Sequence, residues 1–130
     1  MALPDGSLLV AGGGSRKILR IAPDGKFAWM TERLKSSPPG YADLRFPLGI
    51  TADSQGRIWV ADPSRHEILR LAASGKLLGT IGSFGSGQNG GELMLNGPSG
   101  IAALKDLNGK EWIYVADGGN RRLIKLPVNH

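Results

Sequence analysis

Short apolar runs alternate with polar turns along the whole chain. The pattern is fullest in the middle part, where four apolar runs lie at 49–52, 58–61, 67–71 and 77–81. The segments between them are rich in glycine, proline, aspartate and serine, which are residues that form tight turns. Runs this short, bounded by such turns, predict four antiparallel β-strands in succession. The run 58–61 is apolar throughout, which indicates a strand buried on both faces.

The pattern of the middle part recurs on both sides of it. Val10, Val60 and Val115 lie at the same place in three copies, which are 50 and 55 residues apart. A repeat of this length, built from short strands and glycine-containing turns, predicts a β-propeller. We therefore expect a single all-β domain with about three antiparallel, four-stranded blades per chain. The blades should span about 1–46, 47–97 and 98–130.

The two outer copies are shorter than the middle one. The first strand of the first copy is cut short at Met1, and no fourth strand follows in the third copy before His130. We therefore expect about ten strands, with long connections at 31–46 and 82–99 and no helix. Three wedge-shaped blades cannot close a ring and leave unpaired edges. Two chains paired about a twofold axis would close it, and so would further blades of a longer protein.

Several motifs at the blade boundaries indicate a family. The segments 47–50 and 98–102 each combine proline and glycine before an apolar strand that ends in Val-Ala-Asp, and Asp117 is followed by Asn120 and Arg122. In these features the chain resembles the NHL repeats, which form β-propellers, typically of six blades. The resemblance covers nearly the whole chain and implies about half of such a ring. The first two copies differ at the family's Asn and Arg positions, where they carry Ser15 with Lys17 and Arg65 with Glu67.

The turn between the second and third strands carries basic residues at one repeat position. Arg16, His66 and Arg121 occupy this position in the three copies, and Arg65 precedes His66. On a propeller these residues would lie at matching places on one rim of the ring and form an anion-facing surface. They are the candidate ligand-binding residues. The resemblance supports this choice, since such rims are recognition surfaces in NHL proteins and some bind RNA.

Three aspartates are candidates for chemistry. Asp53 follows the innermost strand of the middle copy, where propellers often place groups near the central channel, and the matching stretch of the last copy begins with Leu104. Because it is not repeated, Asp53 is the candidate channel residue. Asp62 and Asp117 recur after the second strand and could serve metal binding or acid–base chemistry. Recurrence favours a structural role, in which each accepts hydrogen bonds from backbone N–H groups of its own turn.

The composition excludes several classes of function. The 130-residue chain has no cysteine, which rules out disulfides and thiolate metal ligands, and its two histidines, His66 and His130, are too few for a zinc site. It contains no Gly-x-Ser-x-Gly, His-Glu-x-x-His or phosphate-loop motif. We therefore predict no catalytic residue, no metal and no cofactor. No apolar run approaches the ~20 residues that cross a bilayer, so no membrane partner is expected.

The sequence leaves three functions open. The first is a non-catalytic binding scaffold for a protein, peptide or small ligand, completed by homodimerisation. The second is a metal-dependent enzyme, because the six-bladed propellers that the chain resembles include lyases and lactonases with a metal at the channel. The third is RNA binding through the basic rim, which the net charge of +5 permits. Nucleic acid is the weaker partner, because Tyr41 and Phe84 are the only aromatic residues expected in loops.

Overall fold

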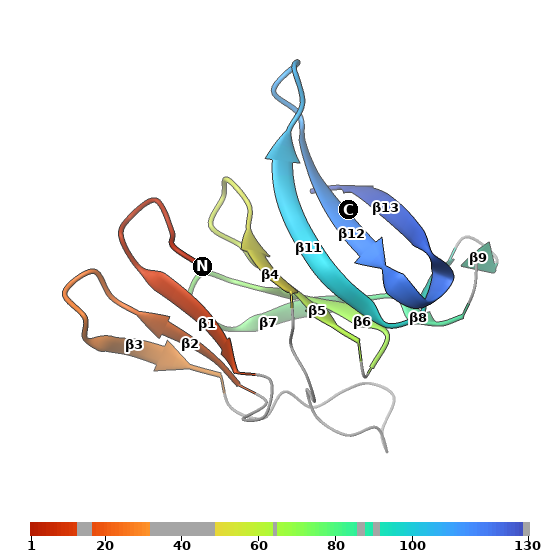
Figure 1. The fold of residues 1–130 in the computed structure, drawn as a ribbon. Helices are drawn as coiled ribbons and strands as arrows, with labels where there is room; N and C mark the ends of the chain where they lie inside the picture. Colours follow the sequence, from red (N-terminus) through yellow and green to blue (C-terminus); the bar gives the residue numbers. More distant parts are fainter. Residues whose placement is uncertain (13–16, 32–48, 64, 86–87, 90–91, 129–130) are drawn as a thin grey trace.

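The computed structural model consists of antiparallel sheets placed side by side like sectors of a ring (Figure 1). The structure describes residues 1–12, 17–31, 49–63, 65–85, 88–89 and 92–128. Blade 1 is a sheet of β1 (Leu8–Gly12), β2 (Lys17–Ile21) and β3 (Phe27–Met30). Blade 2 contains β4 (Gly49–Ala52), β5 (Ile58–Asp62), β6 (Glu67–Leu71) and β7 (Leu77–Ile81). Blade 3 contains β11 (Pro98–Lys105), β12 (Glu111–Asp117) and β13 (Arg122–Pro127).

These sheets confirm the predicted fold class. The three blades hold three, four and three strands, and each lies within one of the predicted blade ranges. In blade 1 a single antiparallel bridge between Ala2 and Leu8 stands where a first strand would begin. The innermost strands β4 and β11 of blades 2 and 3 lie next to one another and β1, the second strand of blade 1, lies next to β4, so the blades are stacked as in a propeller (Figure 1).

The connection between blades 2 and 3 differs from the prediction. Residues 82–97 hold three short strands, β8 (Ser83–Phe84), β9 (Gln88–Asn89) and β10 (Glu92–Leu95). Strand β10 pairs with β8 in parallel and with β9 in antiparallel orientation, so the connection satisfies part of its own backbone hydrogen bonds. One turn of 3-10 helix, η1 (Gly118–Asn120), also forms where we expected no helix. The predicted connection at 31–46 lies almost wholly outside the described residues.

One five-residue turn recurs throughout the structure. In its middle copy the Asp53 N–H donates to the Arg57 carbonyl (2.9 Å) and the Gly56 N–H donates to the Asp53 carbonyl (3.0 Å). The same two bonds close the turns at 3–7, 22–26, 53–57, 72–76 and 106–110. The fourth residue of every copy is a glycine with φ between 81° and 90°. This left-handed conformation is accessible to glycine without steric cost, which explains the glycine spacing of the sequence.

Two apolar layers hold the blades together. Between blades 1 and 2 the buried residues are Leu9, Ile18, Ile58, Val60, Leu69 and Leu71. Between blades 2 and 3 they are Trp59, Ala61, Ile68, Leu95, Ile113, Val115, Leu126 and Val128. Side chains alternate between the faces of a strand, so β5 contributes Ile58 and Val60 to one layer and Trp59 and Ala61 to the other. This confirms the prediction that β5 is buried on both faces.

The outer faces of blades 1 and 3 carry the same repeat positions without a neighbouring blade. On blade 1, Leu8 pairs with Ile21 and Val10 pairs with Leu19. These four residues, which we call the blade 1 face, are the repeat equivalents of the fully buried Ile58, Val60, Leu69 and Leu71. The blade 3 face consists of Tyr114, Ala116, Leu123 and Lys125. They are the repeat equivalents of Trp59, Ala61, Ile68 and Arg70 in blade 2. In blade 2, by contrast, every residue of β5 is buried, because each face of the strand meets a neighbouring blade.

Gly75 offers a test of the packing between blades 1 and 2. A Cβ atom at Gly75 would lie 2.8 Å from Cε3 of Trp29, whereas a Cβ atom at Gly25, which has a similar φ, meets nothing within 4 Å. Alanine in the left-handed conformation costs about 1–2 kcal/mol at either position. We expect Gly75→Ala to lower the free energy of unfolding by about 1–3 kcal/mol more than Gly25→Ala, because only Gly75→Ala overpacks the interface. Urea unfolding followed by circular dichroism measures both; equal losses would contradict the packing shown here.

Candidate functional site

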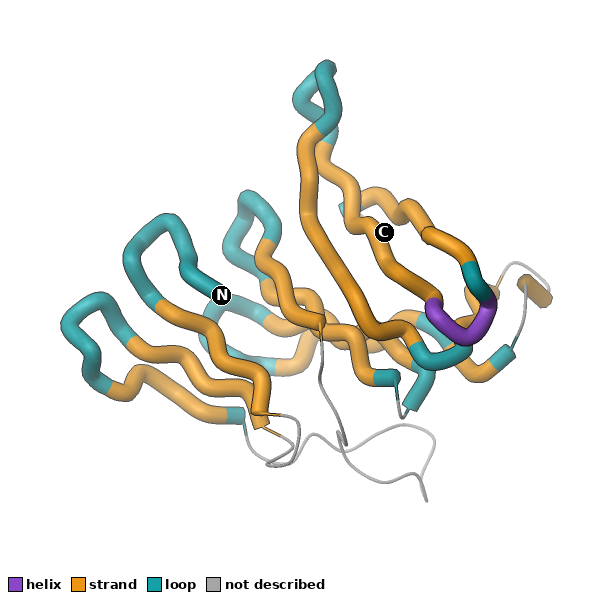
Figure 2. The backbone as a smooth tube through the Cα atoms, in the orientation of Figure 1, coloured by secondary structure: helices purple, strands orange, loops and turns teal. Residues whose placement is uncertain are grey.

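The blades expose two different ends. The five-residue turns gather at one end, which we call the turn end, and the turns between second and third strands lie at the opposite end (Figure 2). We call this opposite end the rim. It includes His66 of blade 2, Arg121 of blade 3 and the short strands β8 and β10 between them. The two ends are considered in turn.

At the turn end, Asp53 serves its own hairpin. Its side chain is 0% exposed. Oδ1 accepts hydrogen bonds from the backbone N–H groups of Gln55 (2.9 Å) and Arg57 (3.0 Å), and Oδ2 accepts from Nε of Arg57 (2.8 Å) and Nε1 of Trp59 (2.9 Å). Four donors occupy the acceptor positions of the carboxylate. The carboxylate is therefore engaged in fixing the turn and Trp59.

The prediction that Asp53 is unique to the middle copy is wrong. In blade 3 Asp106 accepts hydrogen bonds from the backbone N–H groups of Asn108 (2.8 Å) and Lys110 (3.0 Å) and from the indole of Trp112 (3.0 Å). Between the equivalent pairs Ile101–Val115 and Ile50–Val60 and the turn, the β11–β12 ladder has two more residue pairs than the β4–β5 ladder. When the repeat position of Asp53 is counted from the start of the strand, it falls on Leu104 in blade 3. The turn of blade 3 begins two residues later, at Asp106.

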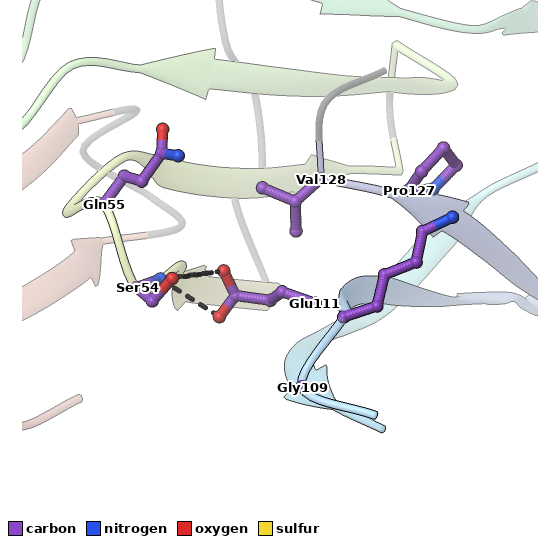
Figure 3. A pocket seen from close by; sticks show the side chains of 7 residues that line it. Ser54, Gln55, Gly109, Glu111, Pro127 and Val128 are labelled. Carbon is purple, nitrogen blue, oxygen red and sulfur yellow. Dashed lines mark hydrogen bonds between the residues drawn. The ribbon is translucent and has the colours of Figure 1, made fainter. Parts of the chain in front are cut away.

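A polar pocket of about 220 Å³ opens between blades 2 and 3 at the turn end (Figure 3). It is lined by Ser54, Gln55, Gly109, Lys110, Glu111, Pro127 and Val128. The carboxylate of Glu111 accepts hydrogen bonds from the backbone N–H (3.0 Å) and the hydroxyl (2.8 Å) of Ser54. The two donors of Ser54 in this pocket are thus already occupied by the protein, and Glu111 ties blade 3 to blade 2.

At the rim, Asp117 organises a buried network. Its fully buried carboxylate accepts hydrogen bonds from the Asn96 backbone N–H (2.7 Å), from Nδ2 of Asn120 (2.7 Å) and from Nε of Arg122 (2.9 Å). Asn120 also donates to the carbonyl of Gly85 (2.9 Å), and Arg122 donates to the carbonyl of Met94. The role is structural, as predicted. The backbone donor, however, belongs to the connection between the blades and not to the turn of Asp117 itself.

Blade 2 replaces this network with a different set of charges. Asp62 and Glu67 are paired across β5 and β6, and both are buried. Arg65 is only 5% exposed and forms an ion pair of 2.8 Å with Glu67. The structure therefore places the guanidinium of Arg65, a candidate ligand-binding group, inside the protein. Burial raises the pKa of Glu67 above 4.5; Arg65 opposes this shift, and the negative charge of Asp62 adds to it.

The raised pKa of Glu67 predicts a pH-dependent stability. The folded protein holds this proton more tightly than the unfolded chain, so the contribution of Glu67 is complete below pH 4.5 and is lost as the pH rises through its raised pKa. Glu67→Gln cannot ionise. We expect the free energy of unfolding of the wild type, relative to Glu67→Gln, to decrease between pH 4.5 and neutrality in urea titrations. A difference that increases over this range would contradict the prediction.

Two other carboxylates change the stability with pH in the opposite direction, and they do so at lower pH. The backbone N–H of Ser7 lowers the pKa of Asp5, and the indole N–H of Trp112 lowers the pKa of Asp106, both from 3.8. Their contributions are present above pH 3.8 and are lost as the pH falls through their lowered pKa values. The effect of Glu67 can therefore be separated from theirs by the pH range.

His66 and Arg121 adopt the same unusual backbone conformation on the rim. Among the described residues they are the only non-glycine residues with positive φ, 56° and 51°. Nδ1 of His66 accepts a hydrogen bond from the Gly97 backbone N–H (2.9 Å), and its ring lies 4.6 Å from that of Phe84. Arg121 is exposed. Arg16, their counterpart in the first copy, lies outside the described residues.

The sequence did not indicate that Phe84 belongs beside His66. The two residues are on different elements, and only the fold of the connection brings β8 against the turn of blade 2. Within the described ranges, no three His, Asp or Glu side chains lie close enough together to hold a metal ion. None of the described residues belongs to a helix long and apolar enough to span a membrane.

The family model of the NHL repeat matches residues 44–71, which include β4, β5 and β6 of blade 2. Comparison with curated protein sequences gave no match. Among solved structures, the chain is similar to an auxiliary nutrient binding protein from Bacteroides thetaiotaomicron, with a TM-score of 0.68, 16% identity, and coverage of 97% of this chain and 36% of that chain.

Two lyases are also similar in structure. A streptogramin B lyase gives a TM-score of 0.58 at 18% identity, covering 98% of this chain and 39% of that chain. The virginiamycin B lyase from Staphylococcus aureus, in a catalytically inactive form with quinupristin, gives 0.57 at 20% identity, covering 98% and 40%. The chain thus spans 36% to 40% of the length of these three structures. At such identities the likeness establishes the propeller fold alone.

Proposed function

We propose that this chain, an NHL-repeat β-propeller unit of three blades, is a non-catalytic binding scaffold whose ring is completed by a second copy. The observation that carries the proposal is the pair of uncovered blade faces. The two existing interfaces, between blades 1 and 2 and between blades 2 and 3, each join one face of the type seen on blade 3 to one face of the type seen on blade 1. The blade 1 face and the blade 3 face are therefore complementary halves of one more such interface. Two copies related by a twofold axis would bring each blade 1 face against the partner's blade 3 face and supply six blades.

The contacts across the existing interfaces support this pairing. Arg20 of blade 1 donates from Nη1 to the Ala73 carbonyl of blade 2 (3.1 Å), and Nε1 of Trp29 donates to the same oxygen (3.0 Å). In blade 2, Arg70 lies over the ring of Trp59 at 5.6 Å. The interface between blades 1 and 2 thus combines apolar packing with a basic side chain of the third strand, and Arg70 stands at the matching position on the side of blade 2 that faces blade 3.

The blade 3 face carries the same arrangement. Lys125, at the repeat position of Arg20 and Arg70, lies over the Trp112 ring at 4.1 Å and over the Tyr114 ring at 6.0 Å. The blade 1 face consists of four aliphatic side chains, which would pack against the blade 3 face of the second copy. Complete burial of one such side chain is worth about 1.5–3 kcal/mol, so covering this face would stabilise a dimer by several kcal/mol.

The binding role has support from the fold. One structural neighbour is a nutrient binding protein, which is compatible with a scaffold. The lyase neighbours favour an enzyme only through the shared fold. Asp53, the residue predicted for a channel site, is engaged by four donors. We therefore do not propose a catalytic function.

Light scattering after gel filtration tests the ring closure. We expect a mass of twice 13.7 kDa for the wild type. Leu8→Glu should raise the dissociation constant of the dimer by about 100-fold or more, because it places a charge in each of two apolar interfaces. Leu78→Glu is the matched control, since Leu78 is 46% exposed, Leu8 is 45% exposed, and Leu78 lies on the outer strand of blade 2.

Two results would overturn the proposal. The first is a wild type with the β-sheet spectrum of a folded protein that runs at monomer mass. The second is a dimer that survives Leu8→Glu unchanged, because the blade 1 face would then lie outside the interface. Loss of the dimer in Leu8→Glu, with retention in Leu78→Glu, supports it.

A further inference from the structure

We infer that the rim between blades 2 and 3 binds a peptide segment that carries a carboxylate next to an apolar side chain. The binding groups are His66, Phe84 and Arg121, which we call the rim cluster. The inference rests on the proposed role as a binding scaffold. It does not rest on ring closure, because all three residues belong to one chain and lie between two blades that already pack together.

The fold of the connection places the three residues in a row. The ring of Phe84 lies 4.6 Å from that of His66, at a tilt of 55°. The next residue, Gly85, accepts a hydrogen bond at its carbonyl from Nδ2 of Asn120 (2.9 Å), and Arg121 follows Asn120 in the chain. Phe84 therefore lies between the turn of blade 2 that carries His66 and the turn of blade 3 that carries Arg121.

Hydrogen bonds fix the two outer residues of the row, His66 and Arg121, or the turns that carry them. The Gly97 backbone N–H donates to Nδ1 of His66, so the neutral imidazole carries its proton on Nε2. The Gly119 backbone N–H donates to the carbonyl of Asn96 (2.7 Å), which fixes the turn before Arg121. His66 and Arg121 both have a left-handed backbone conformation, which residues other than glycine rarely adopt. Such conformations persist where several surrounding contacts hold them in place.

The chemistry of the row is that of a donor surface. Phe84 is 65% exposed, and Arg121 is exposed without an ion-pair partner among the described residues. Asp117 and Glu67, the carboxylates on the same turns as Arg121 and His66, are buried in their own networks. A guanidinium and an Nε2–H group favour an anionic acceptor, and the phenyl ring between them favours an apolar neighbour of that anion.

The strand order favours a peptide as the source of this anion. Strand β8, which carries Phe84, is at the edge of its small sheet, and among the described strands its one partner is β10. An extended peptide can add to such an edge through main-chain hydrogen bonds while its side chains reach the neighbouring groups. A nucleic acid strand depends on several cations along its path, and the rim cluster holds a single guanidinium.

An NMR titration of the ¹⁵N-labelled chain tests the inference. The probe is an acetylated and amidated Leu-Glu-Leu tripeptide, with Leu-Gln-Leu as the matched control. We expect the glutamate peptide to shift the backbone signals of Phe84 and Gly97 and the Nε signal of Arg121. The glutamine peptide should bind about tenfold or more weakly, because its neutral amide oxygen lacks the charge–charge attraction and the bidentate geometry that a carboxylate offers to Arg121.

Two protein variants locate the site. Arg121→Asn removes the charge and keeps a residue that tolerates the left-handed conformation, and should weaken binding of the glutamate peptide about tenfold or more. Lys76→Asn removes one charge from the turn at 72–76, at the opposite end of blade 2, and should leave binding unchanged.

Three outcomes would overturn the inference: no shift at the rim cluster, equal binding by Arg121→Asn and Lys76→Asn, or tighter binding at the same residues by an oligouridylate than by the peptide. The last would assign the rim to nucleic acid. Because the titration reads one chain and light scattering reads the assembly, failure of the rim site is distinguishable from failure of ring closure.

Discussion

Each blade has two apolar faces and therefore needs two neighbours. This requirement follows from β5, in which every side chain is buried: Ile58 and Val60 face blade 1, while Trp59 and Ala61 face blade 3. A sheet of four strands cannot cover both of its own faces, so stability comes from stacking, as in other repeat proteins. The same positions lie uncovered on blades 1 and 3, and this makes the assembly state the central question about the molecule.

Carboxylates keep neighbouring blades in register at both ends of the interface between blades 2 and 3. Glu111 binds Ser54 at the turn end, and Asp117 binds the Asn96 backbone at the rim. Apolar layers alone are tolerant of sliding, whereas charge-assisted hydrogen bonds are directional. Because the buried carboxylate of Asp117 meets three donors, its burial costs less than that of an unpaired charge. The apolar layer supplies most of the cohesion, and these bonds fix its alignment.

The strands of the middle blade could be predicted because local signals determine them. The recurring glycine turns mark both ends of each strand, and the apolar pattern of β5 indicates its burial. Features that depend on distant partners could not be predicted in this way. Phe84 meets His66 only after the connection has folded, and the burial of Arg65 depends on how β5 and β6 lie in the stack. The equivalence of Asp106 with Asp53 was hidden by the different lengths of the two hairpins.

The longer β11–β12 hairpin has a consequence for how such chains diversify. At the turn end its ladder is two residue pairs longer, and the side chains below the extension keep their faces because the pairing there is unchanged. Pairs in an antiparallel ladder alternate between hydrogen-bonded and non-hydrogen-bonded, so an extension by one pair would place the five-residue turn on the other kind of pair, whereas an extension by two preserves it. The tip, with its fully exposed Leu107, thus lies outside the packing constraint. Hairpins at this end of the blades can therefore lengthen in steps of two residues per strand, and new sequences can be accommodated there while the stack of blades stays intact.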